Sequence, residues 1–594
     1  MIRGLLLILL LLPTLLPGQL FAGEAATTPT PAADAKVFYK GRLVSQEFKE
    51  KSEQGLVLFK GKWMPEDEMY AAKGYVKHLG TWTSPSRLKA IQKRQTLARE
   101  RIKFASDWKN AWVYKTEPGH FIITSNVSPE LVKEIGLAME QCYNELAKVF
   151  GAKTAIKNIN IEVYATQEQF LRESAAAGIP MSRNVLGYFY WGPSTGIRAF
   201  YAGTPEQTMS TLFHECTHLV INKVCEEVPT WANEGLAVFF ESALRDEKGM
   251  TLETIPFNRL WHLKSMLKQG DLSLNRLCQL RGMREYTGEY YPQGWALIHF
   301  LLYAEKAKHR KLFENFYGAL TKKAWDGDNM GIFKKYFGRE PETFYPDWKA
   351  YVMSIEPRTA QECVAAATAA YTDWLDFDSA QEFAAKALEL GKGKDEDVFL
   401  CNARLHLTLA RWVSEPERKA EHYAKSVEFF EQVFPPVSDD PKAKKPSKSR
   451  KITPSYAADR LDFARACIGA VRYEQAQDLI EDVLSKKEFE FNAEGYSVLA
   501  YLAVVADDPA FKSIELAKEN AKLAEDLGAD QENKYVQALI CLAENDKSAA
   551  AKFLTEAASR DEFGFGGQFF RRELARLTGM SRKVIVVEQP EDGK

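Results

Sequence analysis

The segment LFHECTHLVINKVCEEVPTWANEGLAVFFES, residues 212–242, constrains the fold more than any other part of the chain. Thr204 is a good N-cap, and a proline follows it at the first helical position, so a helix should run from there to about Lys223. The residues VPTW break this helix, and Thr230 is expected to cap a second helix that continues to about Leu244. A connection of this length can turn the second helix back against the first.

Two histidines lie four positions apart in the first of these helices. On a helix this spacing puts His214 and His218 on one face, a turn apart, within reach of one Zn²⁺. Glu215 lies between them but is rotated away from the ion, where it can take a proton from metal-bound water. A helix that carries two hydrogen-bonded histidines and no metal is the alternative for this pentapeptide alone.

The second helix offers a third ligand. A catalytic zinc usually takes three protein ligands and leaves a fourth position open, and Glu234 should face both histidines if the helices pack together. Glu226 and Glu227 are rival ligands, but they lie in the connection, where solvation is expected. Glu241 lies two turns beyond Glu234 on the same face. It could orient a ligand histidine, although a surface carboxylate is the favoured interpretation.

HECTH followed by WANEGLAVFFE resembles the gluzincin metallopeptidases, particularly the aminopeptidase N branch, in which HExxH precedes a tryptophan, an NEG triplet and an aromatic-rich helix. The resemblance is closest to the peptidase-MA-like domains of exported bacterial proteins, which are common in planctomycetes and are often joined to tetratricopeptide repeats. It covers about residues 111–356. It implies an α+β zincin-like domain with one Zn²⁺ per chain, which is bound by His214, His218 and Glu234, and it implies that Glu215 is the general base.

Two departures from that pattern bear on the type of peptidase. The connection between His218 and Glu234 is shorter than in aminopeptidase N, and no segment resembles the GAMEN sequence that holds a substrate's free amine. An endopeptidase is therefore favoured over an aminopeptidase, and an unusual specificity is the alternative.

The segment EYYPQGWALIHF resembles the family's YxxG segment, which implies that Tyr291 donates a hydrogen bond to the oxyanion. Tyr286 and Tyr290 compete for this role. His262 and His299 lie on apolar helical faces and are expected to be core histidines.

The residues before the metal helix are predicted to form a sheet. His120–Asn126 and Ile159–Ala165 have the pattern of strands, and a helix with an apolar face should follow the first of them. Val185–Ala202 is predicted to form a hairpin around GPSTG. The resemblance implies that its second arm, Ile197–Tyr201, is the edge strand on which the substrate backbone pairs.

The N-terminus has the layout of a secretory signal. In residues 1–23 a positive charge at Arg3 precedes an apolar run from Leu5 to about Leu16, and small residues follow. An uncleaved anchor is the alternative, but prolines make this run short for a membrane span. Residues 24–36 have the composition of a flexible lead. Export to the periplasm or the outside is expected, without stable membrane insertion after cleavage.

Residues 37–110 contain a weak repeat whose copies begin at Gly41, Gly61 and Gly80. Each copy has the pattern of a short strand, a glycine turn, an apolar anchor and a polar helix start, and the anchors are expected to stack into a small core. A charged helix from about Pro85 to Trp108 should lead out of this small β-containing module.

Residues 357–580 are alanine-rich and predicted to be all-α. Helical segments with small residues recur, which resembles tetratricopeptide repeats and predicts a surface for a protein partner. An irregular helical bundle is the alternative. Within this region, residues 435–454 are expected to form a solvated basic loop, with polyanion binding as the alternative, and residues 581–594 form a tail.

The net charge and the cysteine pattern argue against a nucleic-acid-binding protein and against a disulfide scaffold. The formal net charge of −2 gives no global reason to expect nucleic acid or an anionic membrane as a partner. The eight cysteines form no CxxC pair and no dense framework, so buried thiols are expected. A bridge between Cys216 and Cys225 is the alternative for an exported protein.

The sequence thus predicts a zinc-dependent peptidase that hydrolyses peptide bonds of a peptide or protein substrate, with a helical domain for protein interaction. A catalytically silent protein that retains the peptidase fold and acts through its repeats is the alternative. A third hypothesis is hydrolysis of an amide in cell-wall peptide.

Overall fold

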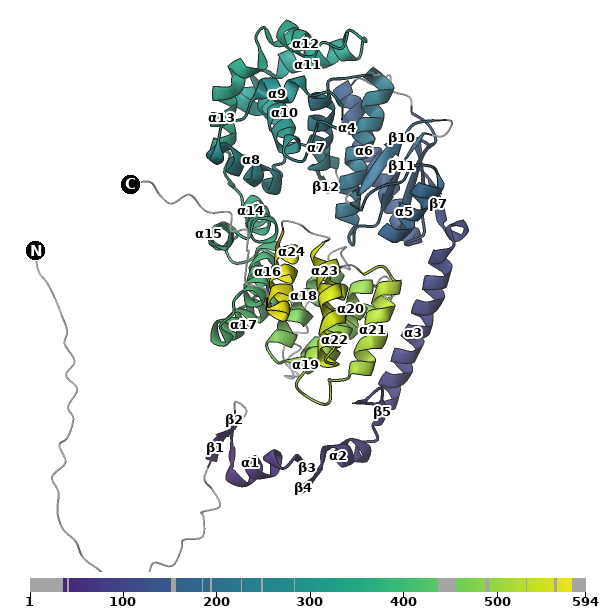
Figure 1. Ribbon diagram of the computed structural model, residues 1–594, viewed down its shortest axis with the longest axis vertical. Coiled ribbons are helices and arrows are strands. Elements are labelled where there is room, and N and C mark those ends of the chain that lie inside the picture. Colours follow the sequence, from purple (N-terminus) through teal and green to yellow (C-terminus); the bar gives the residue numbers. More distant parts are fainter. Residues whose placement is uncertain are drawn as a thin grey trace, which may run out of the picture. The chain divides into compact units, whose positions relative to one another are not determined.

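The computed structural model describes residues 36–39, 42–150, 156–183, 185–192, 195–225, 227–246, 249–282, 284–435, 456–486, 491–529, 531–559 and 564–579 (Figure 1). The predicted signal peptide and tail, and nearly all of the predicted lead and basic loop, lie outside these residues. The chain divides into two compact units, residues 1–76 and 77–594.

The first unit consists of a repeated hairpin and helix. Its elements are β1 (Lys36–Tyr39), β2 (Arg42–Ser45), α1 (Gln46–Glu53), β3 (Leu56–Phe59), β4 (Lys62–Pro65) and α2 (Glu66–Ala72). Lys60 and Gly61 join β3 to β4 with φ angles of 48° and 77°, and two successive left-handed residues are typical of a tight hairpin turn. The repeat predicted from the glycine spacing is therefore confirmed.

The prediction that the apolar anchors stack into a small core is wrong for this unit. Among its described side chains, Met69 is the only buried hydrophobic one. Trp63 stays half-buried and contacts Phe48 of the preceding copy at 5.3 Å between ring centroids. Two-stranded hairpins of four residues have too little apolar surface to enclose such anchors.

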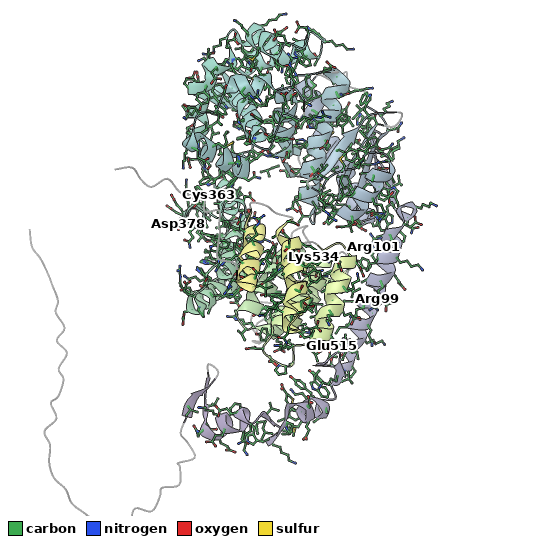
Figure 2. All side chains as sticks on the ribbon, in the orientation of Figure 1. Arg99, Arg101, Cys363, Asp378, Glu515 and Lys534 are labelled. Atoms are coloured by element: carbon green, nitrogen blue, oxygen red, sulfur yellow. The ribbon has the colours of Figure 1, made fainter. Side chains whose placement is uncertain are left out.

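A third copy opens the second unit and ends in the predicted charged helix. Its elements are β5 (Val76–His78), β6 (Thr81–Thr83) and α3 (Pro85–Ser106). Figure 2 marks Arg99 on α3, and this side chain forms an ion pair with Glu519 at 2.8 Å.

A five-stranded sheet follows, with the order β10-β11-β9-β8-β7. Its strands are β7 (Trp112–Lys115), β8 (Phe121–Ser125), β9 (Ile159–Tyr164), β10 (Gly187–Tyr190) and β11 (Gly196–Phe200). The helices beside it are α4 (Pro129–Phe150), α5 (Gln167–Ala176) and α6 (Pro205–Cys225). The predicted apolar face of α4 is buried, with Ile135, Met139 and Leu146 fully enclosed. The predicted strands and hairpin are confirmed.

The edge strand is not the one that the sequence predicted. β11, which covers most of Ile197–Tyr201, pairs with β9 on one side and with β10 on the other. Because the parallel pairing with β9 takes β11 into the sheet, the first arm of the hairpin, β10, is left at the edge next to α6.

The second helix of the opening segment, α7 (Thr230–Glu241), packs against α6 as expected. Two details of the prediction were wrong. Pro229 occupies the N-cap, and the Thr230 hydroxyl instead accepts a hydrogen bond from the Gly282 N–H at 2.9 Å. The helix ends at Glu241 because Leu244 already belongs to a short hairpin of β12 (Leu244–Asp246) and β13 (Gly249–Thr251).

Six further α-helices complete this region. They are α8 (Phe257–Gln269), α9 (Leu274–Gln279), α10 (Tyr290–Ala307), α11 (Arg310–Leu320), α12 (Asn329–Phe337) and α13 (Tyr345–Ser354). Of these, α9 and α10 pack against α7. Trp231, Leu236 and Phe240 of α7 are fully buried, so this helix lies within the core and its side chains are held firmly.

Replacing Gly235 with alanine is expected to destabilise the fold by about 1–3 kcal/mol, because overpacking forces the neighbouring backbone to shift. A Cβ at Gly235 of α7 would lie 2.7 Å from the carbonyl oxygen of Gly294 in α10. Gly318→Ala in α11 is the control, since nothing lies within 4 Å of a Cβ there. Thermal unfolding followed by circular dichroism compares them, and equal melting temperatures would contradict the close contact of α7 and α10.

From Ala360 onward every described element is a helix, as predicted (green to yellow in Figure 1). The helices pack in consecutive antiparallel pairs, and the first helices of successive pairs also contact each other. Their bounds are α14 (Ala360–Asp373), α15 (Phe377–Leu390), α16 (Glu396–Trp412), α17 (Pro416–Val433), α18 (Tyr456–Gly469), α19 (Tyr473–Ser485), α20 (Ala493–Val505), α21 (Ile514–Asp526), α22 (Gln531–Ala543), α23 (Lys547–Ala558) and α24 (Phe565–Thr578). In the part of the chain that the structure describes, no helix has the length and apolarity needed to cross a membrane.

Candidate metal centre

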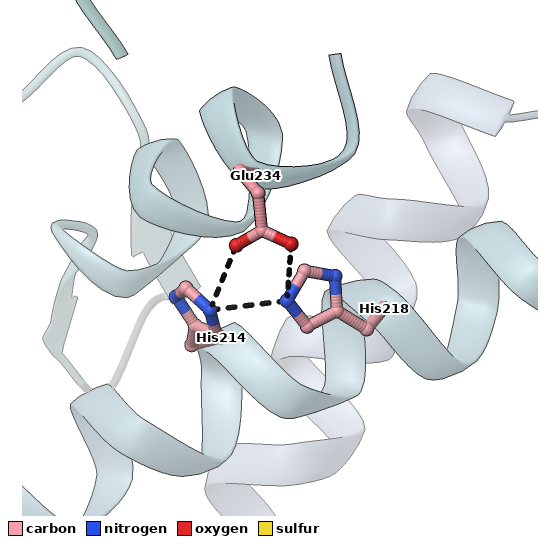
Figure 3. A group of neighbouring side chains, drawn as sticks. All are labelled: His214, His218 and Glu234. Atoms are coloured by element: carbon pink, nitrogen blue, oxygen red, sulfur yellow. Dashed lines mark hydrogen bonds and ion pairs between the residues drawn. The ribbon is translucent and has the colours of Figure 1, made fainter. Parts of the chain in front are cut away.

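Three side chains from α6 and α7 converge in the core, and Figure 3 shows their arrangement. The Nε2 atoms of His214 and His218 lie 3.0 Å apart. The Glu234 carboxylate oxygens lie 3.7 Å from the His214 Nε2 and 3.5 Å from the His218 Nε2. All three ligand atoms fall within 4.8 Å of one another. The sequence prediction that these residues meet is therefore confirmed.

The other ring nitrogens of the two histidines have partners of their own. The Nδ1 of His214 lies 2.9 Å from Glu241 Oε2, and the Nδ1 of His218 lies 3.1 Å from Asn233 Oδ1. Because a carboxylate and an amide oxygen can only accept, each Nδ1 carries a proton, and the two Nε2 atoms face each other. Burial opposes the charge on His214, but the Glu241 carboxylate raises the pKa of this imidazole.

Glu234 adds a buried carboxylate to the two imidazoles. The residue is 1% exposed, and its Oε2 has no hydrogen-bond partner among the described residues. Burial raises the pKa of Glu234 to about 7, against the opposing effect of His214. Burial, assisted by His214, lowers the pKa of His218 to about 4, so that this imidazole is neutral. Two imidazoles and a carboxylate whose Oε2 has no hydrogen-bond partner among the described residues fit a divalent cation, which takes the place of a proton between them.

Glu241 and Arg259 hold His214 in place. Glu241 was favoured as a surface carboxylate, and this prediction is wrong. Its second oxygen lies 2.6 Å from the Arg259 guanidinium. Burial opposes the charge on Glu241, but Arg259 and His214 lower its pKa to about 2. The sequence held no signal for Arg259, which comes from α8.

Glu215 lies close to the pair of histidines without joining the cluster. Its Oε2 accepts a hydrogen bond of 2.9 Å from the Phe189 N–H of β10. This contact fixes the carboxylate between α6 and the edge strand. Glu215 therefore lies beside the cluster of His214, His218 and Glu234, on the side of the edge strand β10.

The three competing tyrosines have different environments. The Tyr286 hydroxyl is committed to the Tyr290 carbonyl oxygen at 2.9 Å. The Tyr291 ring lies 6.3 Å from the His214 ring, and the Arg259 guanidinium lies 5.7 Å from the centroid of Tyr291. Burial and the nearby Glu234 raise the pKa of Tyr291, which keeps its hydroxyl protonated. Of the three, Tyr291 is the one placed beside the cluster.

The remaining candidates lie elsewhere. Glu227 is exposed, and Glu226 lies outside the described residues. His299 is a core histidine as predicted, because it is 4% exposed and bonds the Tyr351 hydroxyl at 2.8 Å. His262 differs from its prediction, since it is only half-buried and contacts Trp374.

The cysteines are free thiols, and most of them are buried, as predicted. Cys216 and Cys225 are both buried and unpaired with each other, and the described cysteines as a group are free thiols.

A family model described as "Protein of unknown function (DUF1570)" matches residues 208–324. The chain is similar to that family over a segment that contains the cluster of His214, His218 and Glu234 together with Glu215 and Tyr291, but not the strand β10. A comparison with curated proteins gives no match.

Proposed function

We propose that the chain is a zinc-dependent peptidase whose metal is bound by His214, His218 and Glu234. The observation that carries this proposal is the convergence of two imidazole nitrogens and a carboxylate oxygen within 4.8 Å of one another, with His218 and Glu234 buried. Two imidazoles and one carboxylate are a typical ligand set of catalytic zinc, whereas calcium and magnesium prefer oxygen ligands alone.

The zincin-like assignment of residues 111–356 rests on a sheet beside a helix with both histidines and on the carboxylate from the next helix. The helical pairs after Ala360 support a tetratricopeptide-like domain for a protein partner. Export to the periplasm or outside the cell rests on the signal-like residues 1–23.

Bound zinc would supply Lewis-acid chemistry, which polarises the scissile carbonyl and makes a water molecule more acidic. Glu215 would accept the proton of that water and pass it to the leaving amine. Tyr291 would donate a hydrogen bond to the carbonyl oxygen as negative charge develops there. β10 would align the substrate by backbone pairing at the sheet edge.

The test measures zinc and cleavage on the full-length protein. We expect about one zinc per chain by plasma mass spectrometry, and cleavage of a mixed peptide library that a chelator stops and added zinc restores. Cleavage of N-acetylated peptides would identify an endopeptidase. Failure to bind zinc contradicts the proposal.

Stoichiometric zinc without cleavage would favour the silent interaction protein. A cell-wall peptide in the library tests the third hypothesis, because selective cleavage of that substrate would identify a cell-wall amide as the target.

Tyr291→Phe is expected to lower kcat by about 10²-fold with little change in KM, because one oxyanion donor is lost. Tyr290→Phe is the control, since it also removes one phenol hydroxyl, and the Tyr290 ring contacts Tyr286. Steady-state kinetics on one cleaved peptide measure both variants. A Tyr291→Phe enzyme with unchanged kcat would assign the oxyanion contact to another group.

A further inference from the structure

A second candidate site lies in the all-helical region, away from the metal centre. Residues from α16, α17, α18, α20, α22 and α24 line a cavity of about 110 Å³. One water needs about 10–15 Å³ of such space, so the cavity holds roughly ten waters or one medium-sized side chain. It is too small for a folded surface, and its size suits a single group that projects from a peptide.

The arginines of the cavity already have carboxylate partners. Arg411 binds Glu532 through two contacts of 3.1 and 3.0 Å, and Arg465 lies 2.7 Å from Glu494. At the rim, Arg576 lies 3.1 Å from Glu573. Their charges are therefore balanced within the protein.

Lys419 is different, because it has no hydrogen-bond or ion-pair partner for its ammonium among the described residues. It lines the cavity and is solvent-exposed, which puts it at the opening. Burial lowers the pKa of Lys419, the nearby Glu573 opposes this effect, and the surrounding arginines add to it. The opening therefore carries an ammonium group that no carboxylate pairs with directly among the described residues.

Three phenol groups provide donors inside the cavity. Tyr423, Tyr501 and Tyr535 all line it, and the described residues offer no hydrogen-bond partner to their hydroxyls. Burial raises the pKa of all three, so they remain neutral donors. Their rings and Phe569 give the same cavity an apolar surface.

We infer that this cavity binds the carboxylate side chain of an acidic peptide segment, with Lys419 as its counter-ion and the tyrosine hydroxyls as hydrogen-bond donors. A carboxylate needs one positive charge and a few donors, and the cavity offers that combination. A phosphate-binding site usually has arginine guanidinium groups free to bind the phosphate oxygens, and the arginines of this cavity are already paired with carboxylates. This site is independent of zinc and of peptide hydrolysis.

The test compares two pools of peptides on the immobilised full-length protein. Both pools are random, N-acetylated, C-amidated hexapeptides; one carries a glutamate at a fixed position and the other a glutamine. Mass spectrometry of the intact retained peptides excludes any that are cleaved. We expect at least tenfold greater retention of the glutamate pool, and no displacement by 10 mM inorganic phosphate.

Lys419→Glu should reduce retention of the glutamate pool to that of the glutamine pool. Lys425→Glu is the matched control on the same helix, because Lys425 pairs with Glu421 and does not line the cavity. Tyr501→Phe keeps the ring and should weaken retention about fivefold through the loss of one donor. Equal retention of the two pools, equal binding by the two lysine variants, or displacement by phosphate would overturn the inference.

Discussion

Replacing Glu215 with glutamine is expected to lower kcat for peptide hydrolysis by about 10³-fold, the effect of removing a general base. The amide keeps the shape of the side chain but cannot accept a proton from water. The zinc content should not change, because Glu215 lies outside the cluster of ligand atoms. Stopped assays on a single peptide, together with metal analysis of the same preparation, measure both quantities.

Glu227→Gln is the matched control, since Glu227 is an exposed carboxylate in the connection between α6 and α7. It should retain full activity. In Glu215→Gln the amide oxygen can still accept the hydrogen bond from the Phe189 N–H, so this contact is retained. A variant with more than a tenth of wild-type kcat would show that another group removes the proton. A loss of zinc would instead show that Glu215 is a ligand.

The parts of the site that follow from local geometry were predictable from the sequence. Four-residue spacing in a helix puts His214 and His218 on one face whatever the rest of the chain does. A break at Pro229 followed by an apolar helix made the return of α7 a reasonable expectation, and with it the position of Glu234. The buried face of α4 followed from periodicity in the same way.

The parts that depend on distant residues were not predictable. Glu241 reads as a surface carboxylate until Arg259 of α8 is placed beside it. The Thr230 hydroxyl is a plausible cap until Gly282 supplies a competing donor. Both arms of the hairpin around GPSTG suit an edge, and only the long-range pairing of β11 with β9 decides between them.

If the cluster binds zinc, Glu234 and Glu241 should contribute to zinc affinity by different amounts. A group that only orients a ligand histidine typically changes metal affinity by about 10–100-fold when it is removed. A direct ligand contributes more, because its loss removes a bond and leaves the remaining acceptors with an incompletely coordinated ion. Comparing Glu234 with Glu241, two carboxylates on one helix, therefore separates binding from orientation.

Glu234→Gln is expected to weaken zinc binding by at least about 10³-fold, more than the roughly 10–100-fold expected for Glu241→Gln. Competition titration with a coloured zinc chelator measures both constants. Zinc should raise the melting temperature of the wild type, because it binds only the folded site, and should leave that of Glu234→Gln nearly unchanged. A zinc-dependent shift of wild-type size in this variant would contradict a role for Glu234 as a ligand.

Without zinc, the Glu234→Gln variant should be more stable than the wild type, the reverse of the order expected with zinc. Burial raises the pKa of Glu234 to about 7, so between its ordinary value of 4.5 and pH 7 the folded state binds more protons than the unfolded state. Stability from this group therefore falls as the pH rises through that window, and the ionised carboxylate is destabilising at pH 8. Glutamine removes that cost, so at pH 8 the metal-free Glu234→Gln protein should melt higher than the metal-free wild type, with the difference shrinking toward pH 5. A stability difference that does not vary with pH would show that Glu234 is not held as a buried acceptor awaiting a cation.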